Sequence, residues 1–343
     1  MGTLGWVSRS LVTASALAGT AAAAQTLTIV TPPGTTALGN VTAGLSGSTT
    51  FTVSTASAVT VTAGTGSRQT VGNVSNGFTL KCVNGNPAAQ RCNAANNTVK
   101  VRITPGAVGG RAGTLTGFQL SGGNGISSGP TTVGASTTFV LSNLTHNANM
   151  NYKIGFSLPI SGGFGPSGAA SAAYTMEFGF TTAYSSGSTN GVVTATTRNP
   201  TQIVKNDDLR FGTIIQNGSS TGTITLTAAG VRSSSNPSGL ALANQATSPF
   251  GVAQYTITAE GGQTLSVSVP TTFTMTCQAP CSAGTNSLTV TTSRDWSGGT
   301  VTVPTPTGNS NTKVLKVGGS FPITGAMARG NYNGTFNVTF NWN

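Results

Sequence analysis

Apolar and polar residues alternate strictly along residues 334–343, the last segment of the sequence. Phe336, Val338, Phe340 and Trp342 occupy alternate positions, and threonines and asparagines lie between them. A period of two predicts a β-strand with one buried face and one face in solvent. Because the pattern runs to the end of the sequence, we expect the edge beside these four residues to lack a strand and to accept one from another chain.

Short alternating runs recur along the rest of the chain. Residues 25–34 read as an extended arm with Leu27 and Ile29 on one face, closed by two prolines, and a strand pattern follows at residues 48–55. Turn residues separate these β-branched runs at short intervals, and no segment has the period of an amphipathic helix. The pattern predicts an all-β protein.

Several blocks occur twice in the same order. Segments 78–82, 153–162 and 174–180 are echoed by segments 273–277, 316–325 and 336–342. Ordered matches at similar offsets indicate a tandem duplication, and the strand spacing in each copy is that of a β-sandwich. The predicted division is a signal peptide at 1–24, an N-terminal donor arm at 25–34, a first sandwich at 35–183, a linker and second arm at 184–204, and a second sandwich at 205–343.

The two arms have two interpretations. In the first, Val192 and Val193 of the second arm complete the first sandwich, while Leu27 and Ile29 complete the second sandwich of a neighbouring subunit. Such strand addition combines backbone hydrogen bonds with apolar side chains that fill pockets. In the second interpretation, each arm is an ordinary first strand that pairs within its own domain.

The N-terminus and the cysteines predict export. Arg9, an apolar run at 11–18 and three alanines at 22–24 have the layout of a cleavable signal peptide. Two close cysteine pairs in an oxidising compartment predict two local disulfides. The predicted pairs are Cys82 with Cys92 and Cys277 with Cys281.

Catalytic, metal and cofactor sites are not expected. The 343 residues carry 16 basic side chains, five acidic ones and one histidine, His146. Asp207 and Asp208 are adjacent and would point to opposite faces of a strand, and Glu260 precedes two glycines at a predicted hairpin tip. The net charge of +11 is spread singly along the chain, without the clustering typical of nucleic-acid binding.

The second half of the chain resembles a known family. Segments 209–214, 255–267 and 330–340, the last reading Gly-Asn-Tyr-Asn-Gly-Thr-Phe-Asn-Val-Thr-Phe, resemble exported bacterial pilin-like domains that are similar to the Mat/Ecp common-pilus fimbrillins. The resemblance covers about residues 200–343. The first copy departs from it, with Leu38-Gly-Asn-Val where the second has Phe211-Gly-Thr-Ile.

The resemblance implies incomplete immunoglobulin-like sandwiches and a secreted, cell-surface pilus subunit assembled by donated strands. Its implied partners are other pilins or copies of itself, a periplasmic chaperone and an outer-membrane usher. One alternative is a two-domain tip adhesin that binds a glycan or surface receptor through residues 35–183. The other is a secreted surface protein that does not polymerise.

Overall fold

The computed structural model describes residues 26–83, 99–122, 125–142, 144–180 and 183–342. These residues form strands, turns and loops, and the fold is all-β as predicted. No helix among them is long and apolar enough to cross a membrane. The predicted signal peptide at 1–24 lies outside the described residues.

Two sheets pack into a first sandwich. One sheet has the order β1-β6-β11-β3-β4, with β8 also paired to β11. Its strands are β1 (Thr26–Thr31), β6 (Gly77–Val83), β11 (Asn149–Ser161), β3 (Ser48–Val53), β4 (Val59–Ala63) and β8 (Thr116–Gly122).

The facing sheet of the first sandwich has the order β5-β2-β13-β12-β7-β10-β9. It holds β5 (Ser67–Arg68), β2 (Thr36–Thr42), β13 (Gly187–Arg198), β12 (Gly168–Gly179), β7 (Val99–Gly109), β10 (Ser136–Leu141) and β9 (Ile126–Val133). Alternate side chains of both sheets meet in one continuous apolar core.

The second sandwich is divided into more pieces. Its largest sheet runs β14-β21-β26-β24-β23-β27, with β17 on β26 and β18 on β17, and the smaller ones are β15-β20, β16-β19 and β25-β22-β28. The strands are β14 (Gln202–Asp207), β15 (Arg210–Phe211), β16 (Thr213–Gln216), β17 (Gly222–Leu226), β18 (Arg232–Ser234), β19 (Leu240–Ala243), β20 (Phe250–Gly251), β21 (Ala253–Glu260), β22 (Thr264–Ser268), β23 (Thr272–Gln278), β24 (Ser287–Arg294), β25 (Thr300–Thr302), β26 (Ser310–Ile323), β27 (Asn331–Asn333) and β28 (Thr339–Trp342).

Strand pairing relates the two sandwiches. The pairing path β1-β6-β11-β3-β4 has its counterpart in β14-β21-β26-β17-β18. Equivalent cross-strand pairs occur in the two: Leu158 lies opposite Phe51, and Phe321 lies opposite Ile224. The chain is therefore a tandem of two immunoglobulin-like sandwiches.

One of the sequence echoes does not reflect equivalent strands. Segment 78–82 lies in β6, which pairs with β1 and β11. Segment 273–277 lies in β23, which pairs with β24 and β27. The counterpart of β6 is β21, so the shared spacing of phenylalanine and cysteine does not mark the same place in the fold.

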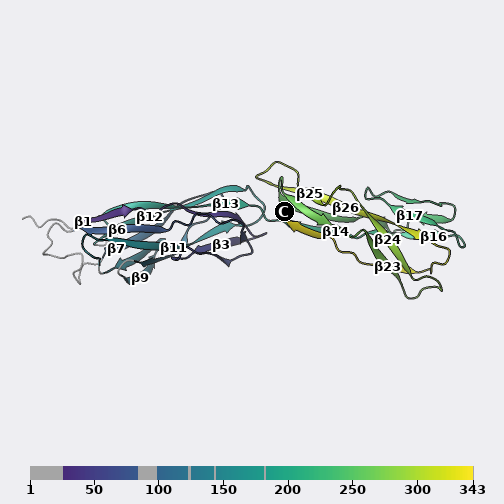
Figure 1. The fold of residues 1–343 in the computed structure, drawn as a ribbon, viewed down its shortest axis with the longest axis horizontal. Coiled ribbons are helices and arrows are strands. Elements are labelled where there is room, and N and C mark those ends of the chain that lie inside the picture. The colour runs from purple at the N-terminus through teal and green to yellow at the C-terminus, as the bar shows by residue number, and fades with distance from the viewer. Residues whose placement is uncertain (1–25, 84–98, 123–124, 143, 181–182, 343) are drawn as a thin grey trace, which may run out of the picture.

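Figure 1 shows the sandwiches end to end, with β1 at the far end of the first and the C-terminus marked beside the junction. Both segments predicted as arms lie inside the first sandwich. β1 is an edge strand on β6, and β13 lies between β2 and β12. In the structure the first sandwich thus spans residues 26–198, whereas the pattern placed it at 35–183.

Candidate functional site

The strand β13 makes the second sheet of the first sandwich continuous. It runs antiparallel to β12 from the pair Gly168–Thr197 to the pair Phe178–Gly187. On its other side it runs parallel to β2, with Val193 opposite Thr36. Removing β13 would separate β2 from β12 and open the core between them.

The two valines predicted in the second arm lie on opposite faces of β13. Val193 is completely buried in the core, whereas Val192 is 37% exposed on the outer face. Ala195 and Thr197 share the inner face with Val193. Period-two geometry requires this split, because neighbouring side chains on a strand point in opposite directions.

No strand occupies the equivalent place in the described part of the second sandwich. The counterparts of β2 are β15 and β16, which pair with β20 and β19. The counterparts of β12 are β27 and β28, which pair on one side with β23 and β22. No described strand pairs with both sets, so the sheet that β13 makes continuous in the first sandwich is interrupted in the second.

The inner side chains of the first sandwich are more deeply buried than those at the matching positions of the second. In the first sandwich the inner residues of β12 are at most 1% exposed: Ala170, Ala172, Tyr174, Met176 and Phe178. The residues at the matching positions, Phe336, Val338 and Phe340, are only partly buried. The predicted edge residues therefore face an incompletely covered core. Trp342 pairs through its backbone with Leu265.

The name open groove is used below for the edge defined by the partly buried residues Phe336, Val338 and Phe340, beside which no described strand pairs. The ring of Phe336 lies 4.9 Å from that of Phe273, and the ring of Phe340 lies 5.9 Å from that of Tyr255. Burial raises the pKa of the Tyr255 hydroxyl. Two separate apolar clusters underlie the second sandwich, in contrast to the single core of the first.

The residues predicted as a donor arm are engaged within their own domain. Leu27 lies opposite Cys82 and is 7% exposed, and Ile29 lies opposite Leu80 and packs against the same core. The arrangement is the ordinary first strand of the second interpretation. The chain thus combines one open groove with an N-terminal segment that is already paired.

A buried carboxylate joins the two sandwiches. Glu260, at the end of β21, accepts hydrogen bonds from Ser167 Oγ at 2.8 Å, an Arg198 guanidinium nitrogen at 3.0 Å and the Asn199 backbone N–H at 3.1 Å. Burial alone would raise the pKa of Glu260, but these three bonds outweigh it and hold the pKa below its ordinary value. Beside this group lies an interdomain cavity of about 670 Å³.

Sequence reasoning missed this junction. Glu260 does precede a turn, but β21 and β22 lie in different sheets, so the turn is not the predicted hairpin tip, and Glu260 is only 7% exposed because the first sandwich covers it. Of the two adjacent acids, Asp207 ends β14 and Asp208 follows it; Lys205 lies 2.7 Å from Asp208, and Arg210 lies near both acids.

One predicted disulfide is confirmed. Cys277 and Cys281 are bonded at the end of β23. Cys92, the predicted partner of Cys82, lies outside the described residues, and that pair stays a prediction.

Among the described residues, no three histidine, cysteine or acidic side chains gather as a metal site would require.

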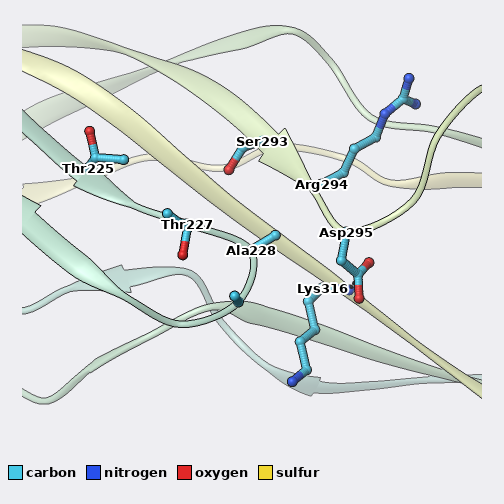
Figure 2. Close-up of a pocket in the computed structure, with 8 residues that line it drawn as sticks. Thr225, Thr227, Ala228, Ser293, Arg294, Asp295 and Lys316 are labelled. Atoms are coloured by element: carbon cyan, nitrogen blue, oxygen red, sulfur yellow. Dashed lines mark hydrogen bonds between the residues drawn. The ribbon is translucent and has the colours of Figure 1, made fainter.

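A shallow pocket on the second sandwich is a further concave region. It lies between β17, β24 and β26 and includes Arg294, Asp295 and Lys316. Figure 2 shows the Arg294 and Lys316 side chains pointing away from each other. Asp295 accepts a hydrogen bond from the Lys316 backbone N–H at 2.9 Å. The basic groups therefore do not converge on a common ligand position.

Comparison with known proteins places the family match on the second sandwich. Residues 201–342 match a family model described as a domain of unknown function, DUF4402. No curated protein sequence matches the chain.

Three solved structures are similar at low identity. The first is a chain of the CsuC–CsuE chaperone–tip adhesion subunit pre-assembly complex from archaic chaperone-usher Csu pili of Acinetobacter baumannii, with 10% identity, TM-score 0.30 and coverage of 92% of this chain and 100% of that chain. The second belongs to a chaperone–tip adhesin complex of CFA/I fimbriae biogenesis, with 13% identity, TM-score 0.29 and coverage of 91% and 97%. The third is the secreted serine protease VesC from Vibrio cholerae, with 12% identity, TM-score 0.16 and coverage of 92% and 51%.

Proposed function

We propose that this chain is the terminal, two-domain subunit of an extracellular pilus, and that its second sandwich is completed by a strand from the adjoining subunit. The observation that carries the proposal is the contrast between the sandwiches. The first contains β13 between β2 and β12, and the second has an open groove at the matching place. An unpaired sheet edge above a half-covered apolar core is a site for strand addition.

The first sandwich provides the template for the donated strand. We expect the donor to run antiparallel to β28 and parallel to β16, as β13 runs relative to β12 and β2. Covering apolar side chains contributes about 1.5–3 kcal/mol for each one fully buried, and each ladder hydrogen bond adds roughly 0.5–1.5 kcal/mol. Ordering the donor costs about 1–2 kcal/mol per residue. Affinity therefore depends on apolar contact within the groove.

The engagement of β1 favours a terminal position over a position in the shaft. A shaft subunit needs both an open groove and a free donor segment. Here Leu27 and Ile29 already pack in the first sandwich, at the end of the chain remote from the open groove (Figure 1). Such a subunit accepts one neighbour and presents its first sandwich outward, where a glycan or surface receptor would bind.

The open groove also implies a partner before assembly. An exposed apolar edge promotes aggregation unless another chain covers it. We expect a periplasmic chaperone to supply a temporary strand and an usher to exchange it for that of the next subunit. The secreted, cell-surface location predicted from the sequence follows from the same route.

Electron microscopy of pili labelled against the first sandwich tests the proposal. Label is expected at filament ends, and label along the shaft would contradict a terminal role. A Phe340→Asp variant, which places a charge in the open groove, should lose incorporation. Thr339→Asp is the matched control, because Thr339 is exposed on the opposite face of β28.

A further inference from the structure

The cavity of about 670 Å³ at the junction has walls from three parts of the chain. Ser67 and Gln69 come from the first sandwich, residues 198–201 connect the sandwiches, and Gln263 and Thr307 come from the second. Ligand pockets of this size hold small organic molecules and often lie at domain interfaces. A single inorganic ion would leave most of the cavity unfilled.

One wall of the cavity carries a buried donor without an acceptor. The Asn199 Oδ1 accepts hydrogen bonds from Arg111 Nη1 at 3.0 Å and from the Gly165 N–H at 3.1 Å, and these two bonds fix which way the amide points. Asn199 is 3% exposed, and its Nδ2 has no hydrogen-bond partner among the described residues. The Thr201 Oγ1, on another residue of the cavity wall, has none there either. An acceptor on a ligand would satisfy both groups, which are costly to leave buried and unpaired.

The charges around this wall favour an anion. Two guanidinium groups, those of Arg111 and Arg198, lie near one carboxylate, that of Glu260. Arg111 also donates to the neutral backbone carbonyls of Ser161 and Gly163, which do not compensate its charge. The Arg198 side chain is half exposed, so the N–H groups that do not bond Glu260 can take a second acceptor. A negatively charged acceptor therefore suits the site better than a neutral one.

Much of the remaining lining is uncharged and polar. Thr42, Thr65 and Thr307 carry hydroxyl groups, and Gln69 and Gln263 carry amides. Each of these side chains can both donate and accept a hydrogen bond, as the hydroxyl groups of a sugar do. The lining thus combines a wall of donors with groups suited to hydroxyls.

We propose that the interdomain cavity binds a hydroxylated organic anion with the chemistry of a sugar acid. The donors of Arg198, Asn199 and Thr201 hold its carboxylate, and the amides of Gln69 and Gln263 hold its hydroxyl groups. Because such a ligand contacts both sandwiches and the segment between them, it fixes their relative orientation. The site is separate from the open groove, and the inference does not depend on the proposed function.

Isothermal titration calorimetry of the full chain with D-glucuronate tests the site. Glucose, which lacks the carboxylate, and acetate, which lacks the hydroxyl groups, are the matched probes. Glucuronate should bind at least about tenfold more tightly than either, because it alone engages both kinds of lining group. Small-angle X-ray scattering should show a narrower distribution of domain orientations when it is bound. Tighter binding of a glucuronate oligosaccharide would identify an acidic polysaccharide as the source, and binding no tighter than the monomer's would identify a free acid.

Three variants locate the binding. Asn199→Asp keeps an oxygen for Arg111 but turns the unpartnered amide nitrogen into a carboxylate oxygen, and it should lower the affinity for glucuronate at least about tenfold. Asn190→Asp makes the same change of charge on the exposed outer face of β13 and should leave binding unchanged. Gln69→Ala removes an exposed amide and should weaken glucuronate binding about two- to tenfold without changing that of acetate.

Several results would overturn the inference. They are no detectable binding of glucuronate, equal binding of glucuronate, glucose and acetate, and glucuronate binding that Asn199→Asp and Gln69→Ala both leave unchanged. Should Asn199→Asp also lower the Tm, Gln69→Ala decides alone, because its exposed side chain does not support the junction. None of these results bears on the open groove, which the Phe340→Asp variant tests separately.

Discussion

The backbone N–H of Asn199 donates a 3.1 Å hydrogen bond to the carboxylate of Glu260, and this contact ties the end of β13 to the turn that follows β21. Asn199 is itself fixed from the other side, because its Oδ1 accepts hydrogen bonds from Arg111 and from the Gly165 N–H. The strand that closes the first sandwich is therefore also the strand that holds the second in place.

Replacing Glu260 by alanine should loosen the junction. The change leaves the Ser167, Arg198 and Asn199 donors without their acceptor, at a cost of about 1–3 kcal/mol for a buried unsatisfied group. Small-angle X-ray scattering should show a broader distribution of domain orientations. Glu177→Ala is the control, since it breaks an arginine–glutamate pair within one domain, and it should leave the scattering unchanged. Equal effects of the two variants would show that Glu260 has no special role.

The junction should also weaken in acid. Hydrogen bonds hold the folded-state pKa of Glu260 below its ordinary value of 4.5, so the unfolded chain binds this proton more readily. The stabilisation is fully present above about pH 4.5 and is lost as the pH falls through the lower, folded-state pKa. The other charged groups near the carboxylate are the guanidinium groups of Arg198 and Arg111. Scattering profiles from neutral pH to about pH 3 should change for the natural chain. Those of Glu260→Gln should not.

The two neighbouring valines of β13 provide a matched pair of substitutions. Val193→Asp places an unpaired charge in the core and should destabilise the first sandwich by more than about 3 kcal/mol. Val192→Asp changes an outward position and should alter stability by no more than about 0.5 kcal/mol. Denaturant unfolding of both variants measures the difference. Similar losses would place both side chains in the core and contradict the burial found here.

The Cys277–Cys281 disulfide should stabilise the second sandwich modestly. It closes a loop of sequence separation four, for which the chain-entropy argument gives about 2 kcal/mol. The double change Cys277→Ser and Cys281→Ser should lower the denaturation midpoint of the second sandwich alone. Loss of folding in the whole chain would show that the bond does more than close a loop.

The sequence predicted the fold well where local pattern determines it. Alternation over 174–180 falls almost entirely in β12, whereas alternation over 336–342 forms a strand only at β28, Thr339–Trp342. Gly39 in β2 and Gly212 between β15 and β16 lie at the same bend of the two copies. Both glycines have positive φ, and a β-carbon at Gly39 would lie 2.3 Å from the Thr70 carbonyl oxygen. The acceptor edge expected at Phe336, Val338, Phe340 and Trp342 stays a prediction.

Long-range features were not predictable in the same way. The local sequence Ala-Glu-Gly-Gly reads as an exposed hairpin, and only the position of the other sandwich buries Glu260. One interpretation of the sequence had Val192 and Val193 complete the first sandwich, but it did not predict that their strand lies between β2 and β12, because its inner positions complement Tyr174 and Ala172 by size. Size complementarity between strands leaves no periodic signal in either one alone.

The parallel contact between β2 and β13 also sets an order of events in folding. Val193 can pair with Thr36 only after the whole first sandwich has been synthesised. Pairing between segments so far apart in the sequence is slow, because the long intervening loop must first be closed. The first unit can nevertheless finish folding from its own residues. Under the proposed function, the second sandwich is completed only when another polypeptide supplies a strand, so its maturation would depend on a neighbour and not on synthesis of this chain alone.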